Sequence, residues 1–190
     1  MQKKYSKSFF KKMTKDKIHF WIETHKKRLI GSAIFAKGTG IGAKLVVWAE
    51  KWTCKDKGFC PSHTGSIVEK DGKILIFDMK PPKASTQNLE SYLCTTKEDF
   101  VLVLRDFKLD SKMFSSTILE HVGQKYPYWS AIQSVFSKRQ TKWNNHCSEL
   151  HLRKLQLQGL FPEINAEITP DELFHLFCNT EGDMTGNIIY

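Results

Sequence analysis

Alternating apolar and polar positions in the middle of the chain predict a β-hairpin. Residues 63–69 alternate, residues 73–79 are rich in β-branched and aromatic side chains, and the Asp71-Gly72 pair between them is a strong signal for a tight turn. Pro81-Pro82 ends the second strand. We therefore expect the chain to reverse at Asp71-Gly72 and to bring residues 77–79 back near residue 63.

Helical periodicity surrounds this hairpin. Asp110-Ser111 provides a capping start, Gly159 a stop, and Thr169 before Pro170 another start. The predicted helices are 18–29, 43–52, 112–122, 129–136, 147–158 and 170–177, and further strands are predicted at 32–36 and 100–107. Strands in the middle followed by helices indicate an α+β fold, with a central antiparallel sheet packed with helices. No linker divides the chain, so we expect one domain over residues 1–190.

Composition is that of an ordinary soluble domain. The chain has 190 residues, 41% hydrophobic and 26% charged, and a chain of this length buries roughly 70% of its unfolded surface. Five cysteines without dense spacing argue against a disulfide framework and for a reducing compartment. The first residues lack the apolar core of a secretory signal, and no run is long enough to span a membrane. We expect a cytoplasmic protein without a transmembrane segment.

The net charge of +9 is concentrated at the start of the chain, where seven lysines fall within residues 1–17. Such a segment attracts anionic partners, for example nucleic acid, phospholipid headgroups or an acidic wall polymer. It is equally typical of a solvated face or a mobile tail. Its aromatic residues, Tyr5, Phe9 and Phe10, would serve either to stack on bases or to dock the segment onto the domain. The sequence leaves these alternatives open, and it contains no specific nucleic-acid motif.

Two segments carry candidate chemistry. His63 begins a predicted strand, and Cys147 begins a predicted helix behind Asn144 and Asn145, which are able to cap it. A cysteine becomes a strong nucleophile when a helix N-terminus and a neighbouring imidazolium stabilise its thiolate. A histidine at a strand start and a cysteine at a helix start therefore predict a thiol nucleophile site.

The motifs Ser62-His63-Thr64-Gly65 and Cys147-Ser148-Glu149-Leu150, in this order, resemble those of the circularly permuted NlpC-type papain-like cysteine hydrolases. The resemblance is to the YiiX/YebB-like branch, which is related to lecithin:retinol acyltransferase, and it covers residues 32–177. It implies a papain-like fold with the nucleophile helix in the C-terminal third. It also implies that Cys147 is the nucleophile and His63 the general base.

The family takes the third catalytic residue from the strand after the histidine strand. Asp78 is our choice, because it is the acid in an otherwise apolar strand that returns toward His63. Glu69 competes, but its place beside the turn suggests exposure. The resemblance also makes Tyr128 and Ser62 candidate substrate-binding residues, although Tyr128 fits buried packing equally well.

Other motifs are weaker. Cys54, Cys60 and His63 have loop spacing suited to zinc, but a fourth ligand at a recognised spacing is missing. The glycines at 38, 40 and 42 match neither a Walker motif nor a dinucleotide fingerprint, and we interpret them as a turn beside the cleft. His146 precedes the nucleophile, and a capping or surface role suits it better than action on the thiol.

These residues predict acyl transfer through a Cys147 thioester, with no metal or organic cofactor. The resemblance implies two substrate classes, peptide amides or lipid acyl groups, so the enzyme would be a peptidase or amidase on one hand, or a lipid acyl hydrolase or acyltransferase on the other. The alternative is a noncatalytic binding module on the same fold that holds lipid, wall polymer or nucleic acid through its basic face.

Overall fold

The computed structural model describes residues 3–37, 59–126 and 146–179. One antiparallel sheet of six strands runs through this part of the chain in the order β1-β6-β2-β3-β4-β5. The strands are β1 (Lys4–Ser6), β2 (Ala33–Lys37), β3 (His63–Lys70), β4 (Lys73–Asp78), β5 (Ser85–Asn88) and β6 (Asp99–Val103). The described helices are α1 (Lys7–Lys11), α2 (Lys15–Leu29), α4 (Leu89–Thr95), α5 (Ser111–Leu119), α7 (Cys147–Gln156) and α8 (Pro170–Asn179). The predicted α+β class is confirmed.

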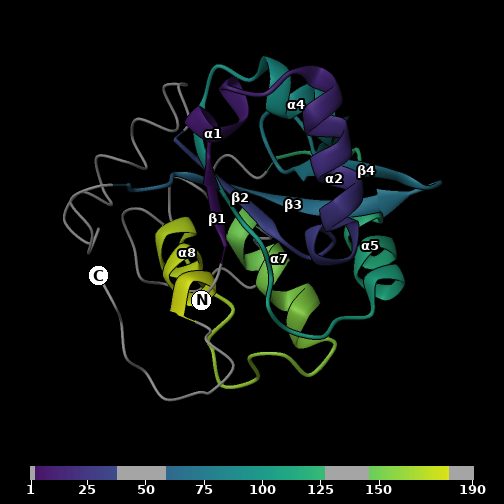
Figure 1. The fold of residues 1–190 in the computed structure, drawn as a ribbon. Coiled ribbons are helices and arrows are strands. Elements are labelled where there is room, and N and C mark those ends of the chain that lie inside the picture. The colour runs from purple at the N-terminus through teal and green to yellow at the C-terminus, as the bar shows by residue number, and fades with distance from the viewer. Residues whose placement is uncertain (1–2, 38–58, 127–145, 180–190) are drawn as a thin grey trace.

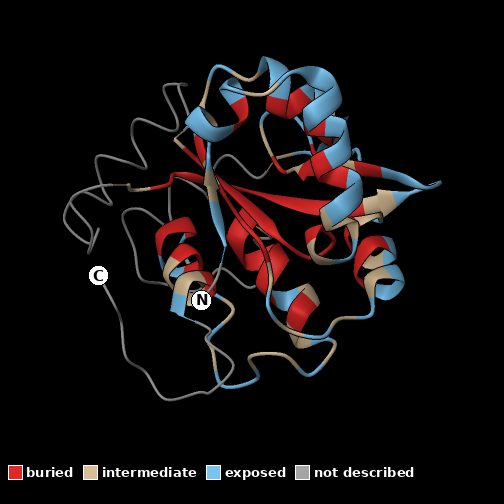
Figure 2. Cartoon of the chain, in the orientation of Figure 1, coloured by how far each residue is buried: buried red, intermediate tan, exposed pale blue. Residues whose placement is uncertain are grey.

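Helices cover both faces of the sheet. In Figure 1, α1, α2 and α4 lie above the sheet, whereas α5, α7 and α8 lie below it. The helix sides that face the sheet are buried and the outer sides are exposed (Figure 2). Phe10 of α1 stacks on Phe100 of β6 in the upper layer. In the lower layer, Phe35 of β2 packs against Phe174 and Phe177 of α8.

The predicted β3-β4 hairpin is confirmed. Lys70 pairs with Lys73, so Asp71 and Gly72 form a two-residue loop with φ values of 51° and 76°. Both values are positive, as a type I′ turn requires, and this turn matches the right-handed twist of the flanking strands. The same register places Gly65 opposite Asp78, so the end of β4 returns to the beginning of β3.

The basic N-terminal segment packs onto the domain. Strand β1 pairs with β6, and Phe10 of α1 is only 1% exposed. The Tyr5 and Phe10 rings lie 4.9 Å and 5.0 Å from the Trp21 ring of α2, near edge-to-face. Of the alternatives that the sequence left open, the structure shows docking of this segment onto the domain through its aromatic residues. Most lysines of this segment are exposed, whereas the Lys7 side chain is only 13% exposed and donates to the Lys97 carbonyl.

Several element boundaries differ from the sequence predictions. Helix α2 begins at residue 15 rather than 18, because the Thr14 side chain accepts a hydrogen bond from the Lys17 backbone. Strand β6 ends at residue 103 rather than 107, and the next residue but one, Arg105, turns its guanidinium onto the Ile30 and Lys27 carbonyls. Helices α5 and α7 end at residues 119 and 156, slightly earlier than predicted. The predicted helices at 43–52 and 129–136, and the predicted glycine turn, lie outside the described residues.

None of the helices in the described part of the chain combines the length and apolar character that crossing a membrane requires.

Candidate active site

Helix α7 lies along strand β3 and runs in the same direction. Near its start, the Cys147 thiol contacts the Thr64 backbone. One turn later, His151 Nδ1 lies 2.8 Å from the Ser66 hydroxyl. Four helical residues advance about 6 Å and two strand residues advance about 6.6 Å, so the two sets of contacts match. This alignment brings the first residue of the helix to the first residue of the strand.

Cys147 is the first residue of α7, and His146 occupies the N-cap position without a side-chain capping bond. The cap is supplied from inside the helix instead, because the buried Glu149 side chain interacts with the His146 backbone and pairs with Arg153 at 2.6 Å. Asn144 and Asn145, the expected caps, lie outside the described residues. The thiol therefore sits where backbone N–H groups and the helix dipole favour negative charge.

His63 lies between the thiol and a carboxylate. Its Nε2 is 2.5 Å from Asp78 Oδ1, and both side chains are largely buried. The ring is also hydrogen-bonded to the Cys147 thiol, a contact that falls to Nδ1 because Nε2 is occupied. Gly65 leaves room for this arrangement, since a Cβ there would lie 2.6 Å from Ile76 Cδ1 and 3.4 Å from Asp78 Oδ1.

The mutual contacts set the charges of these three groups. Burial lowers the pKa of His63, but the Cys147 and Asp78 charges outweigh it and raise the value to about 10. Burial raises the pKa of Cys147, yet His63 and the Thr64 and Ser148 backbones outweigh burial and lower it. Burial likewise opposes ionisation of Asp78, but His63 and Lys80 lower its pKa to about 2. These shifts favour a thiolate at Cys147, an imidazolium at His63 and a carboxylate at Asp78.

Two other candidate residues, Glu69 and Ser62, occupy different places relative to His63. Glu69 pairs with Lys26 at 2.9 Å, near the β3-β4 turn and at the far end of β3 from His63. Ser62 is buried directly before His63, and its backbone N–H donates to the Ala36 carbonyl at 3.0 Å. A substrate-binding role for Ser62 stays a prediction.

Two sequence hypotheses involve residues outside the described part of the chain. Tyr128, a candidate substrate-binding residue, is one of them. Cys54, needed for the zinc alternative, is another, and within the described ranges no cluster of three or more histidine, cysteine, aspartate or glutamate side chains is arranged to hold a metal ion. His63, the third member of that hypothesis, already contacts Cys147 and Asp78.

Sequence reasoning missed Lys80 and Glu98. Lys80 Nζ lies 3.2 Å from Asp78 Oδ2 and 2.8 Å from Glu98 Oε2. The sequence signal was slight, because a lysine before Pro81-Pro82 and a glutamate in a polar loop look like ordinary surface residues. The contact depends on the residue before β6 lying against the segment that follows β4, which no local pattern encodes.

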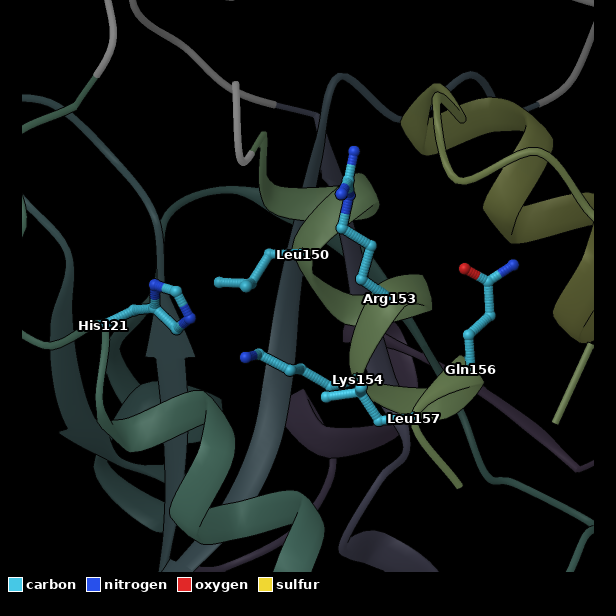
Figure 3. A pocket seen from close by; sticks show the side chains of 6 residues that line it. All are labelled: His121, Leu150, Arg153, Lys154, Gln156 and Leu157. Carbon is cyan, nitrogen blue, oxygen red and sulfur yellow. The ribbon is translucent and has the colours of Figure 1, made fainter. Parts of the chain in front are cut away.

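A hollow of about 430 Å³ lies further along α7, on its outer side. Figure 3 shows that α7 itself provides most of the lining, while His121 faces it from the end of the α5 region. The lining residues are His121, Leu150, Arg153, Lys154, Gln156 and Leu157. Cys147, His63 and Asp78 are not among them, so this hollow is separate from the thiol site.

Comparisons of the chain with protein-family models, curated proteins and solved structures found no match.

Proposed function

We propose that this protein is a cysteine hydrolase or acyltransferase of the permuted papain-like, NlpC-type class, acting on an amide or ester through a Cys147 thioester. The observation that carries the proposal is the position of the His63 ring, hydrogen-bonded to the Cys147 thiol on one side and to Asp78 on the other. Nucleophile, base and orienting acid, in that sequence of contacts, are the requirements of nucleophilic acyl transfer.

In the proposed reaction, the Cys147 thiolate attacks the substrate carbonyl and forms a carbon–sulfur bond. The backbone N–H of Cys147, at the start of α7, donates to the developing oxyanion. His63 then gives its proton to the departing amine or alcohol as the carbon–nitrogen or carbon–oxygen bond breaks. In the second half, His63 takes a proton from water or another acceptor as it attacks the thioester, and the thiolate is released. Asp78 holds the ring in the correct tautomer throughout.

The chemistry of the nucleophile bears on substrate and location. A thiolate attacks peptide amides and lipid acyl groups by the same steps, so both substrate classes belong to the proposal. The exposed lysines around the N-terminal aromatic cluster suit an anionic surface or polymer as a partner. A nucleophile that must stay reduced suits a reducing compartment, which supports a cytoplasmic location.

A noncatalytic binding module is the competing function. Three ionised groups in a mostly buried row cost free energy to desolvate, and binding through a basic surface does not require them. Their arrangement in the order that acyl transfer needs supports catalysis over binding.

Thiol reactivity tests the proposal. We expect iodoacetamide to alkylate Cys147 faster than the exposed Cys94 at about pH 5, where an ordinary thiol is protonated, as measured by peptide mapping. His63→Ala should abolish this advantage and leave Cys94 unchanged. An activated ester should also leave an acyl mass on Cys147. Equal labelling of the two cysteines, insensitive to the histidine substitution, would show that no activated nucleophile exists.

A further inference from the structure

Charged side chains continue the site beyond Asp78. Lys80 Nζ contacts Asp78 Oδ2, the oxygen that His63 does not use, at 3.2 Å. On its other side, Lys80 donates to Glu98 Oε2 at 2.8 Å. From Cys147 to Glu98, five groups therefore follow one another with charges that alternate in sign. Each of the four contacts joins opposite charges.

The charged groups beyond His63 come from different parts of the fold. Asp78 ends β4, Lys80 follows two residues later, and Glu98 directly precedes β6. Tyr92 of α4 donates its hydroxyl to Glu98 Oε2 at 3.4 Å. The Asp78 and Glu98 side chains are only 16% and 19% exposed. A lysine fixed at both sides cannot swing freely, in contrast to a lysine on a solvated surface.

We propose that Lys80 is a positioning residue for the thiol site: held by Glu98, it fixes the Asp78 carboxylate so that Oδ1 faces His63 Nε2. This inference rests on the proposed function, because it assigns a task within the same site. A carboxylate has two equivalent oxygens and rotates about its terminal torsion. With one oxygen bound to Lys80, the other is left directed at the imidazole.

The opposite effect is the physical alternative. Lys80 and the His63 imidazolium are both cations that pair with the Asp78 carboxylate. Lys80 therefore also repels the imidazolium and competes with it for the charge of Asp78. If this repulsion were the main effect of Lys80, removing the lysine would raise the pKa of His63. If positioning is the main effect of Lys80, removing the lysine would lower the pKa of His63, because Asp78 would no longer be held toward the ring. The two effects differ in sign.

Lys80→Met tests this difference, since methionine keeps an unbranched apolar chain but carries no charge. We expect the His63 ring titration, followed by NMR, to move down by about one pH unit. We expect the Cys147 alkylation rate at about pH 5 to fall about 10-fold, the factor that corresponds to one pKa unit. Lys80→Arg, which retains the cation, should restore both within about 2-fold.

Lys26→Met is the matched control. Lys26 is 31% exposed, as Lys80 is, and it also pairs with one glutamate, Glu69, at 2.9 Å. It should leave the His63 titration and the Cys147 rate unchanged. Thermal unfolding of all three variants separates a local change at the site from a general loss of stability.

The outcomes distinguish the two proposals. If the wild-type His63 titration is raised and Cys147 is reactive, but Lys80→Met leaves the titration unchanged or moves it upward, the positioning role is overturned and the proposed function stands. If His63 of the wild-type protein titrates near the ordinary value of 6.5 and Cys147 is no faster than Cys94, both are overturned. A downward shift in Lys80→Met that Lys80→Arg restores supports the positioning role.

Discussion

Acidification from pH 7 to about pH 5 should destabilise this protein through His151. The ring is fully buried beneath β3, between Phe114 and Phe177, whose ring centroids each lie 5.3 Å away. Its Nδ1 contacts the Ser66 hydroxyl at 2.8 Å, and within the described residues Nε2 lacks a hydrogen bond of normal geometry. Burial lowers the pKa of His151 to about 3, with only a small opposing effect from the Gly31 backbone.

The magnitude follows from the two pKa values. In the unfolded chain the ring gains a proton as the pH falls through about 6.5, whereas in the folded protein it stays neutral down to about 3. The stabilisation is therefore present above pH 6.5 and is lost as the pH falls. The free energy of unfolding is therefore about 2 kcal/mol lower at pH 5 than at pH 7, since each pH unit between the two pKa values contributes about 1.4 kcal/mol.

Urea unfolding of the wild type and of His151→Asn at both pH values measures the contribution of His151 to the pH dependence of stability. Asparagine keeps a polar partner for Ser66 but does not titrate, so its lost packing lowers stability about equally at both pH values. We expect the wild type to lose about 2 kcal/mol more than the variant on going from pH 7 to about pH 5. His63 and the carboxylates titrate in both proteins, and their contributions cancel in the comparison. A difference below about 0.5 kcal/mol would refute a buried neutral histidine at this position.

Two further predictions concern the site and the N-terminal cluster. Asp78→Asn should preserve the fold but lower the Cys147 acylation rate by orders of magnitude, because the imidazolium loses its partner, whereas Glu69→Gln should leave the rate unchanged; a large effect at Glu69 alone would contradict the assignment. Phe10→Ala should cost about 3–5 kcal/mol in urea unfolding, whereas Phe20→Ala, at a position 74% exposed, should cost under about 0.5 kcal/mol; equal costs would show that the N-terminal segment does not pack as described.

The hairpin was predictable because its information is local. Asp71-Gly72 specifies the turn, the turn specifies the register, and the register carries Asp78 back to Gly65, two residues beyond His63. The meeting of His63 with Asp78 could therefore be anticipated from about fifteen residues of sequence. Helix starts were predictable for the same reason, as at Thr169, whose hydroxyl accepts from the Glu172 backbone at 3.2 Å while the Glu172 carboxylate accepts from the Thr169 backbone at 2.9 Å.

Elements fixed by distant pairing were not predictable in this way. Strand β5, Ser85–Asn88, is polar and exposed, and it is a strand because it pairs with the edge of β4. Strand β1 is three residues long and depends on β6, nearly one hundred residues later. Helix α4 has one apolar side of buried residues, but its seven residues are too few for periodicity to show. The same limit hid Glu98, whose role exists only once the residue before β6 lies against Lys80, two residues after β4.

Two buried histidines, His63 of β3 and His151 of α7, show why residue type alone does not reveal charge. Burial lowers the pKa of His63, but the neighbouring Cys147 and Asp78 outweigh burial and raise it to about 10. The stabilising charge of His63 is therefore present below pH 6.5 and is lost as the pH rises toward 10. His151 lies against a hydroxyl and two phenyl rings, so its contribution is lost in the opposite direction, as the pH falls toward 3. Because the two losses begin on either side of 6.5, both contributions are near their full value only around neutral pH. The fold and the proposed ion pair are therefore favoured in the same pH range.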